Sequence, residues 1–315
     1  MRIGIQLPSF SFGGAVSDIG PTFARLVREA EPAGLDSLWV MDHFFQIRSV
    51  GAAEEPMLEG WSTLAFAAAL TERITLGTMV TGVHYRHPGV LVKTATTLDV
   101  LSGGRAWLGI GAGWNERESR GLGVPFPPLG ERFDRLEEQL AVITGLWSTP
   151  PGETFDFAAT HYPVHANPGL VAPAQPGGVP IIVGGGGKRR TPTLAARYAA
   201  DFNAGFQSVD DTGRLFQQVD DVCRELGRDP STLVHSAAQV VCIGRDDATV
   251  RRRAAAIGRE VDELIENGIA GSVEQARERL GRLEEVGTTR VYLQVLDLSD
   301  LDHLADVYEA LAGPA

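Results

Sequence analysis

The sequence alternates eight times between short apolar segments typical of β-strands and longer amphipathic segments typical of α-helices. Strands separated by helices pair in parallel, because a helical crossover returns the chain to the same end of the sheet. No linker or abrupt change of charge interrupts the series. We therefore predict the α/β class and a single (β/α)8 TIM barrel over residues 1–315. The expected strands cover 3–7, 38–42, 74–80, 106–110, 179–183, 201–206, 235–243 and 289–296.

The helix signals between these strands differ in clarity. The clearest helix is the fourth, in which apolar residues recur on one face between positions 133 and 146. A charged helix is expected over 247–267. The next helix should begin at Ser272, which forms a capping-box pattern with Gln275.

The rhythm breaks between residues 148 and 178, which are rich in proline, glycine and aromatic residues. Segments 154–156 and 161–164 could pair as a small hairpin. We interpret this stretch as an insertion between strands four and five, at the rim of the fold. A segment this long without helices is unusual unless it covers a site.

Composition limits the partners and the compartment. The net charge of −12 and the pI near 5.1 argue against a nucleic acid or an anionic membrane surface as a partner. Two cysteines, Cys223 and Cys242, are too few for a disulfide framework and favour a reducing setting. The N-terminus enters a strand at once, which leaves no room for a signal peptide, and no apolar run has membrane-spanning length. We expect a soluble, cytoplasmic homodimer that acts on a small molecule.

Polar residues follow three of the expected strands. Asp42-His43 follows the second strand, segment 82–88 follows the third, and segment 109–116 follows the fourth. Parallel barrels keep their chemistry at the carboxyl ends of their strands, where these segments would meet. An isolated Asp-His pair can also be purely structural. The glycines of 109–113 either let a ligand approach the backbone or simply form a loop, and their spacing is not the dinucleotide-binding fingerprint.

Four consecutive glycines, Gly184, Gly185, Gly186 and Gly187, follow the fifth expected strand, and the cations of 188–190 come next. Successive backbone N–H groups before a helix can bind a phosphate, and local positive charge favours this in an acidic protein. A flexible hinge is the alternative. The seven histidines are scattered without metal-ligand spacing, so no metal site is expected.

Five blocks of the sequence together resemble the bacterial luciferase-like superfamily, and specifically its branch dependent on the deazaflavin coenzyme F420. They are SLWVMDHF (37–44), LGTMVTGVHYRHP (76–88), GGRAWLGIGAGWNERE (103–118), ERFDRLEEQL (131–140) and VPIIVGGGG (179–187). The resemblance implies a (β/α)8 barrel with an insertion after about the fourth strand. It also implies a non-prolyl cis peptide between Met79 and Val80, in a bulge that supports the cofactor ring.

The resemblance assigns further roles position by position. His43 occupies the place of the active-site histidine of F420-dependent glucose-6-phosphate dehydrogenases. The positions expected to contact the cofactor, besides the bulge, are Asp42, Thr81, Gly111, Asn115 and the glycines Gly184, Gly185, Gly186 and Gly187 as the phosphate loop. Two positions depart from those dehydrogenases, because Ala112 replaces a catalytic glutamate and Ile47 replaces a tryptophan. Glucose 6-phosphate is therefore not the expected substrate.

The resemblance predicts an oxidoreductase that transfers a hydride between F420 and a small organic substrate. We expect His43 to act as the general acid–base, with Asp42 seating its ring. Two alternatives remain open. One is an FMN-dependent monooxygenase of the same superfamily, and the other is a non-catalytic flavin-binding protein on the same scaffold.

Overall fold

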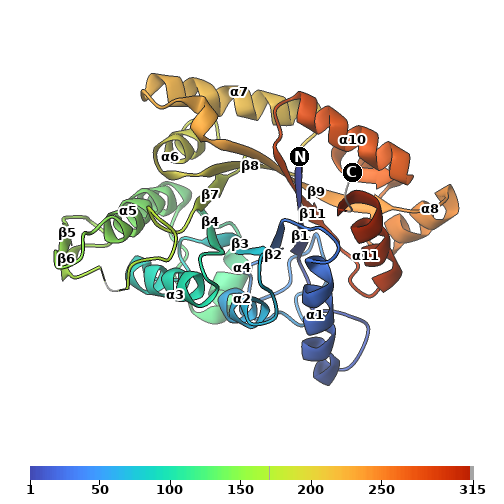
Figure 1. Ribbon diagram of the computed structural model, residues 1–315, viewed down its shortest axis with the longest axis horizontal. Helices are drawn as coiled ribbons and strands as arrows, with labels where there is room; N and C mark the ends of the chain where they lie inside the picture. Colours follow the sequence, from blue (N-terminus) through green and yellow to red (C-terminus); the bar gives the residue numbers. More distant parts are fainter. Residues whose placement is uncertain (170, 313–315) are drawn as a thin grey trace.

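A computed structural model describes residues 1–169 and 171–312, and within these ranges eight parallel strands close into a central barrel (Figure 1). β1 pairs with β2 on one side and with β11 on the other, and β8 pairs with β9 to close the ring. The predicted barrel is thus confirmed. Its strands are β1 (Arg2–Leu7), β2 (Ser37–Val40), β3 (Thr75–Gly82), β4 (Ala106–Gly111), β7 (Ile181–Gly184), β8 (Asp201–Gly205), β9 (Val234–Ile243) and β11 (Arg290–Gln294).

Helices surround this ring and bury one face each against it (Figure 1). The longest is α5, in which Leu136, Leu140 and Ile143 are buried at helical spacing. Burial of each such side chain contributes about 1.5–3 kcal/mol. The helices that link successive barrel strands are α1 (Val16–Ala30), α2 (Gly60–Ala68), α3 (Pro88–Leu101), α5 (Leu129–Trp147), α6 (Arg190–Tyr198), α7 (Val209–Glu225) and α10 (Val273–Glu285), and α11 (Leu301–Val307) follows the last strand. Two short helical turns also occur, η1 (Pro230–Thr232) between α7 and β9 and η2 (Tyr308–Ala312) after α11.

Large side chains fill the inside of the barrel. Trp39 and Tyr292 are fully buried and their ring centroids lie 4.8 Å apart. Met79, Ile182 and Ala238 pack against them. Met79 and Ala238 also line the cavity described below, so this packed layer is the floor of that cavity.

The third strand carries the expected irregularity. The peptide bond between Met79 and Val80 is cis, as the resemblance predicted. The pairing of β3 with β4 shifts register between Thr78 and Thr81 at the same place. The side chains of Met79 and Val80 consequently lie at the cavity.

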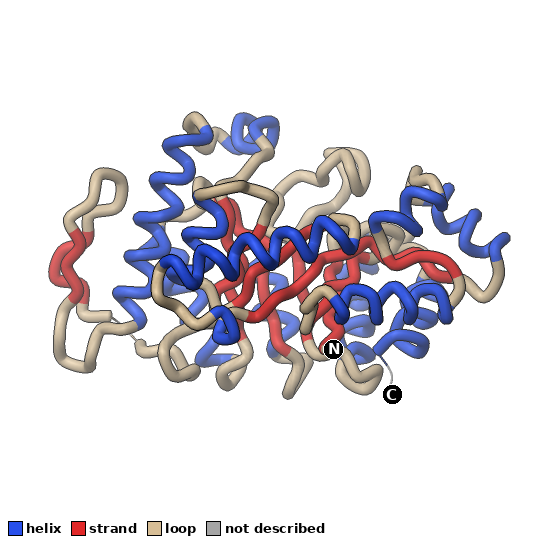
Figure 2. Tube along the Cα trace, turned by 90° about the horizontal axis from the view of Figure 1, so that it is seen from above, coloured by secondary structure: helices blue, strands red, loops and turns tan. Residues whose placement is uncertain are grey.

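The segment after α5 forms the expected hairpin but not in the expected place. β5 (Phe155–Phe157) pairs antiparallel with β6 (Val164–Asn167). The hairpin packs on the outer face of α5 through an apolar cluster that includes Tyr162, and both views place it outside the ring of helices (Figures 1 and 2). None of its described residues lines the cavity. The prediction that 148–178 covers the site is therefore wrong, because a segment that follows a helix begins at the amino ends of the strands.

A second excursion, after β9, does reach the cavity. The single helix expected over 247–267 is two helices, α8 (Asp247–Ala256) and α9 (Val261–Asn267), followed by β10 (Ile269–Gly271), which pairs with β9. The break falls at Gly258, whose φ of 64° is left-handed and ends α8. Arg259, Glu263 and Asn267 from this excursion line the cavity.

The described part of the chain contains no helix that is both long and apolar enough to span a bilayer. Cys223 and Cys242 are both buried free thiols. The capping box at Ser272 is present as predicted, with Gln275 closing it.

Candidate active site at the carboxyl ends of the strands

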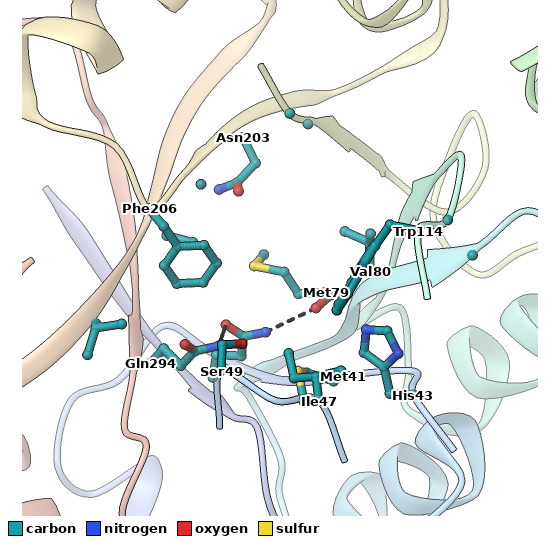
Figure 3. Close-up of a pocket in the computed structure, with 18 of the residues that line it drawn as sticks. Met41, His43, Ile47, Ser49, Met79, Val80, Trp114, Asn203, Phe206 and Gln294 are labelled. Atoms are coloured by element: carbon teal, nitrogen blue, oxygen red, sulfur yellow. Dashed lines mark hydrogen bonds between the residues drawn. The ribbon is translucent and has the colours of Figure 1, made fainter. Parts of the chain in front are cut away.

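A cavity of about 540 Å³ opens at the carboxyl ends of the barrel strands (Figure 3). Its apolar lining comes mainly from Met41, Met79, Val80, Phe206 and Val240. A mostly apolar cleft with a few fixed polar groups is the usual form of a small-molecule site. The polar groups therefore decide what the cavity can do.

His43 lies at the cavity wall directly after β2, next to Trp114 (Figure 3). Its Nδ1 lies 2.7 Å from Oε2 of Glu118. Because an ionised carboxylate only accepts hydrogen bonds, Nδ1 carries the proton and Nε2 is left as the basic nitrogen. A histidine oriented by a carboxylate is the usual arrangement of a general acid–base.

Glu118 is fully buried and holds several donors at once. Oε1 accepts from the backbone N–H groups of Phe44 and Phe45, and Oε2 accepts from Nδ2 of Asn115 at 3.0 Å. Burial acts to raise the pKa of Glu118, but the hydrogen bonds from His43, Phe44 and Tyr85 keep it below its ordinary value. Glu118 is thus an ionised group that ties the loop after β2 to the loop after β4.

Sequence reasoning did not identify Glu118. The residue lies in the first turn of α4 (Glu116–Leu122), a helix that we also did not predict. Asn115 caps α4, since its Oδ1 accepts from the N–H of Glu118 at 3.4 Å. The pattern of asparagine followed three residues later by glutamate is a helix-start signal and could have indicated α4.

Asp42 does not seat His43, contrary to the prediction. Its carboxylate binds both terminal nitrogens of Arg86, with one bond of 3.0 Å, and accepts from Oγ1 of Thr81 at 2.9 Å. Arg86 also binds Glu59. Asp42 is almost fully buried and is not part of the cavity lining. The cluster instead braces the ends of β2 and β3, and the orientation of His43 falls to Glu118.

The four-glycine loop lies only partly at the cavity. Gly184 and Gly185 line it, whereas Gly186 and Gly187 are exposed at its edge. The N–H of Gly185 is already bonded to the backbone oxygen of Asn203 at 3.1 Å. The N–H of Gly185 is therefore not free to bind a phosphate, in contrast to the prediction for this loop.

The cations after the loop divide into two groups. Arg190 turns away and pairs with Asp134 on α5 at 2.7 Å. Lys188 and Arg189 are exposed and pair with no described carboxylate. These two supply the positive charge next to the loop.

Of the remaining predicted positions, Thr81, Gly111 and Asn115 are not part of the cavity lining. Ile47 lines the cavity, while Gly111 lies at the end of β4 beside Val80. Ala112 packs against the core and is not part of the lining. Among the described residues, no cluster of three or more potential ligand side chains could hold a metal ion.

Several lining side chains were not predicted as site residues. Gln6 lies on β1 and Asn203 on β8, whereas Tyr85 and Phe206 lie in the loops that follow β3 and β8. Gln294 also lines the cavity, at the end of β11. Gln6, Asn203 and Phe206 are single residues within expected strands, so nothing local distinguishes them. Tyr85 falls within segment 82–88, which was expected at the carboxyl ends of the strands.

Fold and site together define a (β/α)8 barrel with a cavity at the carboxyl ends of its strands, where such barrels keep their active sites. The model of the luciferase-like monooxygenase family matches residues 1–291, and the chain therefore belongs to this family.

Curated relatives include an F420-dependent glucose-6-phosphate dehydrogenase of Intrasporangium calvum, 37% identical over 188 residues, or 59% of this chain and 52% of that protein. Another is the F420-dependent hydroxymycolic acid dehydrogenase of Mycobacterium tuberculosis, 32% identical over 70% of this chain and 59% of that protein. The chain spans about half the length of the first such relatives.

Solved structures share the fold over the whole chain. An F420-dependent secondary alcohol dehydrogenase in complex with an F420-acetone adduct superimposes with a TM-score of 0.83 at 20% identity, over 100% of this chain and 99% of that one. A long-chain alkane monooxygenase gives a TM-score of 0.79 at 15% identity, over 99% and 90%. At these identities the likeness extends to the fold alone.

Proposed function

We propose that this protein is an F420-dependent oxidoreductase that transfers a hydride between F420 and a small organic substrate. The observation that carries the proposal is the His43–Glu118 pair at the wall of an apolar cavity edged by glycines. The relatives named as F420-dependent dehydrogenases support the same cofactor.

The residues present fit this cofactor. Met79 and Val80 provide an apolar surface on which a flat ring can pack. A Cβ on Gly184 would lie 2.5 Å from the backbone oxygen of Asn203, so only glycine fits at this edge of the cavity. Lys188 and Arg189 place positive charge where a phosphate would lie against the loop.

F420, when bound, supplies the acceptor or the donor of a hydride. The chain itself supplies the proton partner. In substrate oxidation, Nε2 of His43 takes the proton that leaves the substrate hydroxyl, and in reduction the imidazolium returns it. Glu118 holds the ring and stabilises its positive charge, while the apolar lining limits the access of water.

The substrate is proposed to differ from glucose 6-phosphate. Ala112 offers no carboxylate, and Ile47 presents an aliphatic side chain to the cavity. Arg259, the arginine in the lining, is paired with Glu263. Among the described residues, the lining therefore offers no unpaired arginine or lysine to a sugar phosphate.

We further propose a cytoplasmic homodimer. Large apolar side chains are exposed on the neighbouring helices α2 and α3, with Phe66 exposed by 46%, Val90 by 58% and Leu101 by 75%. A second copy would bury them. Light scattering should then give twice the chain mass of 33.7 kDa.

The purified protein should bind F420 at least tenfold more tightly than FMN, a difference of about 1.4 kcal/mol. Parallel titrations of the cofactor-free protein with both compounds measure this ratio. Equal affinities, or FMN that co-purifies stoichiometrically, would instead favour the FMN-dependent monooxygenase.

Gly185→Val should weaken F420 binding. Gly185 has a φ of 122°, which a β-branched residue adopts only with strain, so the loop would have to move. The matched control is Gly186→Ala, because a Cβ there meets nothing within 4 Å and the backbone N–H is kept. Titration should show lost affinity for the first variant alone. Normal binding by Gly185→Val would mean that the loop is only a hinge.

A further inference from the structure

Two amide side chains of the cavity have their polarity fixed by the groups behind them. They are Asn203 near the end of β8 and Gln294 at the end of β11, and they lie on the side of the cavity opposite His43 and Trp114 (Figure 3). An amide can present either its oxygen or its NH₂ group to a ligand, and only its other hydrogen bonds decide which.

The chain of bonds behind Gln294 starts at a backbone carbonyl. Nε2 of Gln6 donates to the carbonyl oxygen of Met79 at 3.0 Å, the bond drawn as a dashed line in Figure 3. Because a carbonyl oxygen only accepts, the Gln6 amide must direct its Nε2 toward Met79. Its Oε1 is then directed toward Gln294. Nε2 of Gln294 donates to that oxygen at 3.1 Å. Gln294 therefore has its Oε1 left over.

The chain behind Asn203 starts at the buried carboxylate of Asp201. Oγ of Ser236 donates to this carboxylate at 2.6 Å, and the hydroxyl of Tyr292 donates to it at 2.8 Å. Because the Ser236 hydroxyl donates its one hydrogen to Asp201, its oxygen accepts from Nδ2 of Asn203 at 2.9 Å. Asn203 therefore has its Oδ1 left over.

Among the described residues, no group donates to Oε1 of Gln294 or to Oδ1 of Asn203. The surroundings offer no substitute, since Phe206, Ala238 and Val240 line the same side of the cavity with apolar atoms. A ligand that displaces water from these oxygens without donating to them binds more weakly, because the oxygens lose their hydrogen bonds. A ligand with N–H or O–H groups replaces those hydrogen bonds.

We propose that Asn203 and Gln294 determine substrate specificity as a pair of fixed hydrogen-bond acceptors, which select a compact apolar molecule carrying two donor groups, such as a diol. The assignment to substrate and not to cofactor rests on the function proposed above. Ser236 and Gln6 are positioning residues in this arrangement, because they act through the two amides.

The test uses three probes with one carbon skeleton, namely cis-cyclohexane-1,2-diol, cyclohexanol and cyclohexanone. Dissociation constants are measured by ligand-observed NMR at pH 8, with and without saturating F420. Burial raises the pKa of Asp201 to about 6, so its carboxylate is ionised under these conditions. We expect the diol to bind most tightly and the ketone least, with a step of roughly threefold for each hydrogen bond.

Asn203→Leu and Gln294→Met should each remove about one of these steps. Gln175→Met is the matched control, because Gln175 is an equally bonded amide at the opposite end of the barrel, donating to Asp99 and to the carbonyl of Ala106. The control should keep the full order of affinities. Ser236→Ala should reduce the differences in affinity between the probes, because the Asn203 amide is then free to rotate. Ser236→Thr keeps the hydroxyl and should restore these differences. Loss of packing alone would not give this pair of results.

Equal affinities for the three probes, or variants that keep the wild-type order, would overturn the proposal. An order that exists without F420 and disappears when F420 is bound would also overturn it, because the acceptors would then serve the cofactor. If F420 does not bind at all, the proposed function fails, and the order in the cofactor-free protein still decides whether the two oxygens select donors.

Discussion

His43→Ala should still bind F420, but single-turnover hydride transfer to an accepted substrate should slow by roughly a hundredfold or more. The imidazole is the group at the cavity wall that is oriented by a buried carboxylate, with Nε2 left basic. The glycine edge and the Met79–Val80 wall do not depend on it, so cofactor binding should change little. Rates are to be normalised to cofactor-loaded protein, since this separates lost chemistry from lost binding.

If His43 has a purely structural role, the opposite result is expected for the rate and the stability. In that case His43→Ala would lower the melting temperature and leave the normalised rate unchanged, and His43 would no longer be a candidate acid–base. Trp114→Phe is a matched control. Trp114 packs edge-on against His43 with ring centroids 5.6 Å apart, but its indole cannot act as a general acid–base. The variant should keep most of the rate.

Glu118→Gln should slow the same step by roughly 10²–10⁴-fold, the range for loss of a general acid–base. The amide keeps an oxygen for the N–H groups of Phe44 and Phe45 but turns an NH₂ group toward Nδ1 of His43. Nδ1 must then accept, which moves the histidine proton to Nε2 and removes the base from the cavity. Single-turnover rates and cofactor titrations measure the effect.

Glu118→Ala adds a loss of stability to the loss of rate. It removes the buried acceptor of the half-buried donors of Phe44, Asn115 and Tyr85, at a cost of up to about 1–3 kcal/mol for each group left unsatisfied. Because the native pKa of Glu118 lies below its ordinary value of 4.5, the stabilisation is present above pH 4.5 and declines as the pH falls further. Denaturant unfolding of wild type and both variants at pH 7 separates the two effects. A wild-type rate in Glu118→Gln would rule out Glu118 as the residue that orients His43.

Much of the fold follows from local patterns in the sequence. Apolar segments and helix faces recur within a few residues, so the eight strands and the outer helices could be placed from periodicity alone. The errors are also local in origin. Gly258 splits the helix expected over 247–267, and α4 is too short for its apolar pattern to stand out.

Some features of the candidate site also follow from local sequence alone. The sequence by itself determined that His43 comes after a barrel strand, that Gly184 and Gly185 lie at the end of another, and, through the resemblance, that Met79–Val80 is cis. These statements need only the chain on either side of each residue.

Only the tertiary structure decided which residues act on one another. Glu118 reaches His43 across 75 positions, and Asp42, its immediate neighbour, binds Arg86 instead. The hairpin of 155–167 lies away from the cavity, although its composition suggested a cover. The physical reason is that a closed ring of strands brings together side chains from all around the chain, and a partner that is distant in sequence leaves no periodic signal at either position.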